Sequence, residues 1–453
     1  MLQLRRSLGF FDVVFFFVIA CTNLQWVATA AAAGPQSLPV WIIGALAMFV
    51  PLAIVVMKLS ARFPDEGGMY VWSKRAFGPF AGFVTGWTYW CSNLPYFPAL
   101  MYFTAGNALW VSGNGTQLGG SPLYYVTFSL LGFALATALQ CFGLGTGKWL
   151  INAGALSRWL VTILLVVLGA IAWHAFGSAT RIDAASLTPT AHLKDMIFWS
   201  IIAFAWTGPE SIPFMGGEIR DAERAMPRAL ALAAPIIAAI YIVGTLAVLA
   251  IVPARHVSSI YGVMQAITAG AARFGWGWIA PAAAILVTLS CLASVGAWLG
   301  SIARIPLVAG IDRYLPAAFG RVHPRYGSPV VALLTQAGFT ALFIIAGQSG
   351  STVKGAYDVL VSATVLITMI PFALLFSSAI KLRPSPLMIL CAVVGLFTTL
   401  AAMLLSLVPS DGDTNPGLSL FKILALTALM LGGGAVVYYI GVRKHGKPAI
   451  DQV

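Results

Sequence analysis

A carboxylate interrupts an apolar stretch at residues 206–210, where the chain reads Trp-Thr-Gly-Pro-Glu. Gly208 and Pro209 disfavour a helix interior, and Glu210 places an ionisable group among hydrocarbon side chains. Non-helical backbone at membrane depth is tolerated only inside the protein or beside a water-filled cavity. A carboxylate at that depth is costly and indicates a functional site. Interrupted spans of this kind build the substrate sites of secondary transporters.

Glu210 admits two interpretations. In a low-dielectric pocket it would bind a proton, the amine of a substrate, or each in turn. Alternatively, it would hold the broken backbone by accepting amide hydrogens. The break would also point freed amides and carbonyls into the cavity, which suits a zwitterion or an amine. The alternative for the break is a proline kink without a ligand.

Arg158 is a second ionisable group expected at membrane depth. It follows Lys148 by ten residues, which places it about 15 Å further along the same helix. Arginine keeps its proton, so Arg158 would act as a fixed cation. The alternatives are that it extends to the interface, or that it pairs with Asp12 or a carbonyl. Asp12 and Asp358 fall near span ends, where gating or solvated roles are expected.

Aromatic and small polar side chains supply the remaining candidates, because aromatic faces attract ammonium groups by roughly 0.5–2 kcal/mol. They gather in residues 87–96 and in a polar segment, residues 21–26. The alternative is helix packing and interfacial belts. The predicted substrate-binding residues are Thr22, Asn23, Gln25, Trp26, Asn93, Tyr96, Phe204, Ala205, Trp206, Thr207, Glu210, Ser294 and Trp298. Glu210 and Arg158 are the predicted coupling residues.

The composition indicates that these residues are held by membrane-spanning segments. Of 453 residues, 59% are hydrophobic and only 9% are charged, against about 25% charged in soluble domains. The chain therefore reads as a multi-span membrane protein. Its net charge of +12 lies between spans rather than in one patch, which argues against a nucleic-acid partner. The five cysteines fall in apolar runs, where burial is expected. No metal-ligand spacing is present, and no cofactor is predicted.

Twelve apolar segments are long enough to cross a bilayer, which takes about 20 residues. The first contains the polar segment 21–26, and the sixth contains the break at 206–210. The first lacks a signal-peptide cleavage site and reads as a retained span. The segments are 10–31, 38–61, 77–111, 122–143, 149–174, 193–217, 227–252, 275–305, 329–347, 355–380, 386–408 and 418–441.

The charges between spans predict orientation. With the N-terminus in the cytoplasm, 19 of the 26 lysines and arginines fall on the inner side and 6 on the outer side, and Arg158 lies within a span. This asymmetry predicts that both termini are cytoplasmic. We expect a plasma-membrane location, which in a bacterium is the inner membrane.

The two interrupted spans suggest an internal repeat. If spans 1–5 and 6–10 correspond, their odd number forces opposite orientations. Residues 1–176 would form the first inverted repeat, residues 193–381 the second, and residues 384–447 an appended helix pair. The halves show no direct sequence similarity. The segment 254–274 is too long for a plain turn and predicts a short amphipathic helix.

Three stretches resemble the amino acid–polyamine–organocation superfamily of permeases. Residues 63–72, with the glycines and aromatics of 77–87, are similar to the FPxxGGxYxW…GxxxGFxxGW pattern. Residues 208–211 are similar to GxES, and residues 217–229 to GEVxNPxRxxPRA. The resemblance covers nearly the whole chain. It implies an all-α, five-plus-five inverted-repeat (LeuT-like) fold with two extra helices, and transport of an amino acid, a polyamine or a related amine.

One departure from the family pattern bears on the substrate. The family's first span usually breaks at a Gly-Ser-Gly-type sequence whose amides receive the substrate carboxylate, whereas residues 21–26 (CTNLQW) contain no glycine. Side chains of Asn23 and Gln25 would fill part of that space. A polyamine, an amide or a decarboxylated amine is then favoured over an ordinary α-amino acid. Related folds bind sodium between spans 1 and 8, where Arg158 would replace the ion.

The motif at residues 217–228 faces the cytoplasm in this topology. Glu218, Arg220, Arg62 and Asp65 are predicted to form a charged inner gate. Exposed ion pairs contribute only about 0–1 kcal/mol each, so a gate would need a network. The alternative is a solvated helix surface.

The sequence thus predicts a secondary active transporter of an amino acid, a polyamine or a small amine, working by alternating access, and not an enzyme. Proton coupling or exchange is expected over sodium coupling. The alternative is a membrane channel or a substrate-sensing receptor on the same fold, although an open pore would need rings of charges or carbonyls. Beyond the substrate, the expected partners are the lipid bilayer and a proton, and the chain would act as a monomer or a homodimer.

Overall fold

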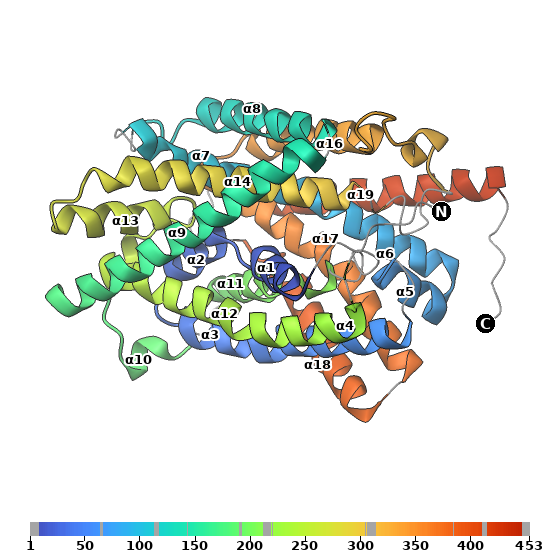
Figure 1. Cartoon of the computed structure of the whole chain (residues 1–453), viewed down its shortest axis with the longest axis horizontal. Coiled ribbons are helices and arrows are strands. Elements are labelled where there is room, and N and C mark those ends of the chain that lie inside the picture. Colours follow the sequence, from blue (N-terminus) through green and yellow to red (C-terminus); the bar gives the residue numbers. More distant parts are fainter. Residues whose placement is uncertain are drawn as a thin grey trace.

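The computed structural model describes residues 9–63, 67–112, 117–142, 144–189, 193–211, 219, 221–303, 305, 314–383, 385–409 and 415–445. These residues form a bundle of long helices (Figure 1). Helices suit a bilayer because they satisfy backbone polar groups within one segment. Ten helical segments of the described chain are long and apolar enough to cross a membrane. The protein is a multi-pass membrane protein.

The first apolar segment is two helices, α1 (Phe10–Cys21) and α2 (Leu24–Ala32), separated by Thr22 and Asn23. Both intervening residues have extended backbone, with φ/ψ of −119°/136° and −144°/133°. The interruption falls inside the polar segment 21–26, at the centre of the bundle (Figure 1). It frees backbone amides and carbonyls where a continuous helix would bond them internally.

The sixth apolar segment is interrupted as well. Helix α11 (Leu193–Ala205) ends before Trp206, and a short 3-10 turn covers residues 209–211. Gly208 has a φ of +129°, a conformation that glycine adopts without steric cost. A Cβ placed on Gly208 would lie 2.6 Å from Cys21 Sγ and 3.2 Å from Cys21 Cα. The two interruptions therefore touch.

The third apolar segment, predicted as one span at 77–111, contains two helices. Helix α6 (Pro79–Cys91) ends at Ser92, and helix α7 (Asn93–Ala108) follows it. Pro95 has no N–H with which to bond the Cys91 carbonyl, so the helix cannot continue unbroken here. The predicted third span thus consists of two consecutive helices, and Ser92 between them lines the same cavity as residues of the other two broken segments.

The remaining helices complete the bundle. The second apolar segment comprises α3 (Ser37–Gly44), a π-helical turn (Ala45–Phe49) and α4 (Val50–Arg62). Helix α5 (Met69–Phe77) precedes α6. The others are α8 (Pro122–Cys141), α9 (Leu144–Phe176), the short α10 (Ala184–Leu187), α12 (Ala222–Ile251), α14 (Ile279–Ile302), α16 (Val330–Gln348), α17 (Val353–Leu382), α18 (Pro386–Leu405) and α19 (Pro416–His445).

Burial separates central from peripheral helices. Within an apolar stretch of 18 residues in each segment, 82% of the α1–α2 stretch and 83% of the α17 stretch is buried, against 28% of the α8 stretch. Leu123 of α8 and Phe397 of α18 are 77% and 75% exposed, as expected of side chains that contact lipid. Helix α7 is buried along almost its whole length as well. The centre of the bundle thus includes the first apolar segment, α7 and α17.

The segment 254–274 contains the predicted short helix, α13 (Gly262–Arg273). It packs against α2, α9, α12 and α14. In Figure 1 it lies at the end of the bundle opposite α5.

Candidate functional site

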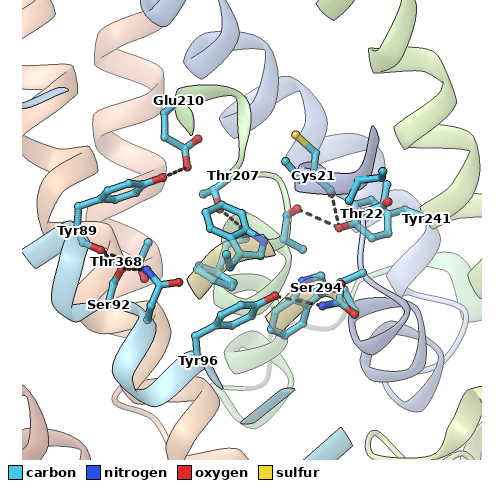
Figure 2. Close-up of a pocket in the computed structure, with 18 of the residues that line it drawn as sticks. Cys21, Thr22, Tyr89, Ser92, Tyr96, Thr207, Glu210, Tyr241, Ser294 and Thr368 are labelled. Carbon is cyan, nitrogen blue, oxygen red and sulfur yellow. Dashed lines mark hydrogen bonds between the residues drawn. The ribbon is translucent and has the colours of Figure 1, made fainter. Parts of the chain in front are cut away.

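A cavity lies where the two broken segments meet (Figure 2). Its volume is about 50 Å³ for the centres of water-sized molecules, which gives room for several waters or a small ligand. Its walls come from both broken segments, from α6 and α7, and from α9, α12, α14 and α17.

Most of the predicted substrate-binding residues line this cavity, as does Arg158. From the first segment these are Thr22, Asn23 and Trp26; from α7, Asn93 and Tyr96; from the sixth segment, Phe204, Ala205, Thr207 and Glu210; and from α14, Ser294 and Trp298. Residues as distant in the chain as Thr22 and Trp298, which are 276 positions apart, are thereby brought together around one small space.

Gln25 and Trp206 do not line it. Gln25 is fully buried, and its Nε2 donates to Tyr357 Oη at 2.9 Å. Successive helical residues are about 100° apart, so Gln25 faces away from the side of α2 that carries Trp26. The indole of Trp206 contacts α3 instead of the cavity, and its Nε1 donates to the Trp41 carbonyl at 3.1 Å.

Glu210 is buried at the edge of the cavity with two hydrogen-bond donors. Its Oε2 accepts the Gly208 amide at 2.6 Å, and its Oε1 accepts the Tyr89 hydroxyl at 3.1 Å (Figure 2). Neither of the ion pairs between described residues, Arg181–Asp183 and Lys354–Asp358, involves it. The geometry is compatible with both a structural and a binding role for Glu210. Its Oε2 stabilises the turn at Gly208, and its Oε1 contacts Tyr89 in the cavity wall.

Arg158 is 7% exposed and joins three helices. Its Nη1 donates to the Ile19 and Thr22 carbonyls at 3.0 and 2.7 Å. On α14, its Nε donates to Ser290 Oγ at 3.1 Å, and its Nη2 donates to the Ser290 carbonyl at 3.4 Å and to Ser294 Oγ. A guanidinium has five N–H donors, and all five have protein acceptors here.

Asp12 is not a partner of Arg158. It is exposed in the first turn of α1, where its Oδ2 accepts the Gly9 amide at 2.8 Å. Of the alternatives considered from sequence, pairing with carbonyls is therefore the one observed for Arg158. Asp358 is likewise away from the cavity and pairs with Lys354 at 2.7 Å.

Asn23 caps the helix that follows the first interruption. Its Oδ1 accepts the Gln25 amide at 3.1 Å, and its Nδ2 donates to Tyr96 Oη at 3.1 Å. The capped helix α2 thus presents a side-chain amide where an uncapped terminus would present free N–H groups.

Aromatic rings form the apolar part of the wall. The ring of Phe204 meets Trp26 edge to face at 5.4 Å and lies 6.1 Å from Tyr96, measured between centroids. These rings and Trp298 line the cavity together with the polar groups. Such faces attract cations.

Several lining residues were missed from sequence: Ile19, Ala20, Cys21, Tyr89, Ser92, Tyr241 and Thr368. Tyr89 and Ser92 belong to the aromatic-rich stretch 87–96, which could have indicated them. Tyr241 lies in the apolar run AAIYIVG, which carries no such signal. Its hydroxyl reaches the Cys21 carbonyl at 2.6 Å and the Ala205 carbonyl at 3.2 Å, so it bridges the two interruptions.

The predicted inner gate is described only at Arg62. Asp65, Glu218 and Arg220 lie outside the described residues. Arg62 is exposed at the end of α4, where its Nη1 donates to the Leu382 carbonyl at 3.2 Å and its guanidinium lies 5.3 Å from the Phe63 ring centroid. These contacts join the ends of α4 and α17.

In the described part of the chain, histidine, cysteine, aspartate and glutamate residues form no cluster that could hold a metal ion. All five cysteines are free thiols, four of them buried and Cys141 partly exposed. Cys21 is the one that lines the cavity. The chemistry available there is hydrogen bonding and charge, from a carboxylate, a guanidinium, hydroxyls and aromatic rings.

Comparison with known proteins identifies a family and several relatives that the chain resembles. The amino acid permease family matches residues 8–439. An uncharacterised transporter of Legionella pneumophila is 29% identical over 97% of this chain and 97% of its own length. The probable agmatine/putrescine antiporter AguD of Lactococcus lactis is 23% identical over 75% of this chain and 72% of its own length.

A solved structure shares the fold. The crystal structure of MhsT in complex with L-phenylalanine matches with a TM-score of 0.57 and 12% identity, covering 87% of this chain and 97% of MhsT. The all-helical membrane fold is therefore LeuT-like. From the family match over nearly its whole length, the chain belongs to the amino acid permease family, a family of transporters rather than enzymes.

Proposed function

We propose that the protein is a secondary active transporter that carries an amino acid, a polyamine or a related small amine across the plasma membrane by alternating access. The observation that carries this proposal is the small cavity at the meeting of two broken segments, which holds a buried carboxylate. Interrupted helices around a buried site are the means by which transporters expose backbone dipoles to a substrate. A small site lined by buried side chains suits an occluding carrier better than an open pore.

In this proposal the substrate occupies the cavity between Glu210 and the aromatic wall. The ammonium group of the substrate binds near the carboxylate, and Trp26, Tyr96, Phe204 and Trp298 contact the rest of the molecule. Support comes from the fact that all five side chains line one space. An ammonium group beside aromatic faces gains roughly 0.5–2 kcal/mol.

The proposed architecture has twelve spans, with α6–α7 as the third and α11 with the residues after it as the sixth. Residues 1–176 and 193–381 form two inverted repeats, and residues 384–447 form an appended helix pair. The location of the interruptions in the first and sixth spans supports this correspondence. Both termini are proposed to face the cytoplasm, as the 19-to-6 distribution of basic residues favours.

Coupling is proposed to use a proton or a second substrate molecule rather than sodium. Glu210 binds a proton and the substrate ammonium in alternation, since one carboxylate cannot pair fully with both. Arg158 is a permanent positive charge that bonds α1 on one side and α14 on the other. That is where related folds hold sodium, so a cation site there would be filled by the protein itself.

The inner gate remains part of the proposal. Arg62 joins α4 to α17 through the Leu382 carbonyl, and release of this contact would let the inner ends of the two helices separate. We propose that Asp65, Glu218 and Arg220 complete the network. Because exposed pairs contribute about 0–1 kcal/mol each, the gate depends on several of them acting together.

Uptake into liposomes containing the purified full chain tests the function. Labelled putrescine, agmatine, lysine and serine serve as probes, with and without an opposing pH gradient. We expect saturable uptake of at least one probe and faster entry into liposomes preloaded with the same unlabelled compound. Non-saturable uptake without this acceleration would favour a channel, and no uptake of any probe would contradict the proposal.

A further inference from the structure

We propose that the cavity takes small cationic amines that lack a carboxylate, and that it discriminates against the corresponding amino acids. The proposal rests on the proposed function, since it concerns the substrate of the same cavity. It follows from one juxtaposition: three protein groups suited to bind a substrate carboxylate are already bonded to other protein groups, while a carboxylate and aromatic rings face the cavity.

The first occupied group is the N-terminus of α2. Free amides at a helix N-terminus bind anions through their N–H groups and the helix dipole. Here Asn23 Oδ1 already accepts the Gln25 amide at 3.1 Å. The same side chain is held from its other end, since its Nδ2 donates to Tyr96 Oη at 3.1 Å. A substrate carboxylate would have to displace this cap.

The second occupied group is the amide at the other interruption. The Gly208 N–H is bonded to Glu210 Oε2 at 2.6 Å. A substrate carboxylate that approached this amide would also meet the negative charge of Glu210. Two carboxylates in one buried site repel each other strongly.

The third occupied group is the guanidinium. Each of the five N–H donors of Arg158 is bonded to the protein, two of them to the carbonyls of Ile19 in α1 and Thr22 just after it, and three to Ser290 and Ser294 of α14. A guanidinium binds a carboxylate through two parallel N–H donors. Arg158 has no such pair to offer unless it releases α1 or α14.

The groups that remain suit a cation. Glu210 lines the cavity and carries a negative charge when ionised, and the rings of Trp26, Tyr96, Phe204 and Trp298 line the same space. The cavity has room for a small molecule, since its volume for the centres of water-sized molecules is about 50 Å³. Its chemistry therefore fits an ammonium group on a short apolar or hydroxylated chain.

Matched pairs test the discrimination on the purified full chain in detergent. Each pair is an amino acid and the amine left when its carboxylate is removed: serine and ethanolamine, leucine and isoamylamine, ornithine and putrescine, lysine and cadaverine. Dissociation constants come from the rise in unfolding temperature with ligand concentration. In every pair with measurable binding, we expect the amine to bind at least tenfold more tightly.

Two variants of Asn23 test the cause. Asn23→Gly removes the cap and frees the Gln25 amide, so the preference for the amine should fall at least tenfold. Asn23→Asp keeps a good cap and adds a negative charge, so amine affinity should rise severalfold while amino acid affinity falls. Ser385→Gly is the matched control, because Ser385 also caps a helix, at the Met388 amide of α18, and does not line the cavity.

The outcomes separate this proposal from the function on which it rests. Equal or tighter binding of any amino acid than of its amine would overturn the discrimination and leave the transporter proposal standing. Unchanged preference in a folded Asn23→Gly protein would overturn the role of the cap. No binding and no uptake of any of the eight compounds would overturn both proposals.

Discussion

Gly208 is the point at which the two interrupted segments touch, and its replacement by alanine tests that arrangement directly. On the present backbone the added Cβ would lie 2.6 Å from Cys21 Sγ, 3.2 Å from Cys21 Cα and 3.3 Å from the Ala20 carbonyl oxygen. The thiol can rotate away, but the backbone atoms can move only if α1 moves. Gly208 also has a φ of +129°, where a side chain is strained.

The free-energy cost of Gly208→Ala is the sum of the steric overlap at Cys21 and the backbone strain at Gly208. Overpacking of a tight interior typically costs about 1–3 kcal/mol, and a residue in a sparsely populated backbone region costs about 1–3 kcal/mol. Gly208→Ala should therefore disfavour the touching arrangement by about 2–6 kcal/mol. Since 1.4 kcal/mol is a factor of ten, even the lower value reduces its population roughly 30-fold.

The assay combines thermal unfolding of the purified protein with the initial rate of uptake in liposomes. We expect Gly208→Ala to unfold at a lower temperature and to lose most uptake. Gly338→Ala is the matched control, since no atom lies within 4 Å of a Cβ added there. Adding Cys21→Ala to Gly208→Ala should restore part of the loss, because it removes the contact with Sγ and leaves the contact with the backbone.

Wild-type stability and wild-type uptake in the Gly208→Ala protein would refute the reasoning. The two interruptions would then not be in contact in the working protein, and the cavity between them would need another description.

Three further predictions concern the residues around the cavity. Glu210→Gln keeps an acceptor for the Gly208 amide but cannot bind a proton, so uptake should lose its pH dependence while the protein stays folded; retained pH dependence would make Glu210 structural. Phe204→Ala should weaken the apparent affinity for the transported probe more than it lowers expression, and an unchanged affinity would move the site elsewhere. Arg158→Lys retains the charge but offers three donors in place of five, so at about 1.5–3 kcal/mol per lost charged hydrogen bond it should lower the unfolding temperature markedly; an unchanged unfolding temperature would show that these bonds contribute little.

Much of the architecture could be predicted because its signals are local. Gly208, Pro209 and Glu210 mark an interruption by their own chemistry, and the polar segment 21–26 marks the other. Composition alone identified a membrane protein. Phe204, Trp26 and Tyr96 could be proposed because they stand close in sequence to those interruptions or to the prolines of α7.

What could not be predicted depends on helix rotation and on partners distant in the chain. Gln25 and Trp26 are neighbours, yet a rotation of about 100° sends one toward Tyr357 and the other into the cavity. Tyr241 looks like any aromatic residue of an apolar helix until its hydroxyl meets Cys21 and Ala205. The division of the third segment at Ser92 needed the position of Pro95 within its helix, which apolar length does not give.

The hydroxyl of Tyr241 has a mechanical consequence. It carries one hydrogen and stands within reach of two carbonyl oxygens, at 2.6 Å on the Cys21 side and 3.2 Å on the Ala205 side. If the interrupted backbone moves at either site, the Tyr241 hydroxyl can rotate and donate to the other carbonyl oxygen. The number of hydrogen bonds then stays the same. A donor shared in this way keeps the ends of α1 and α11 connected through Tyr241. It also adds little to the free energy needed to shift one end relative to the other.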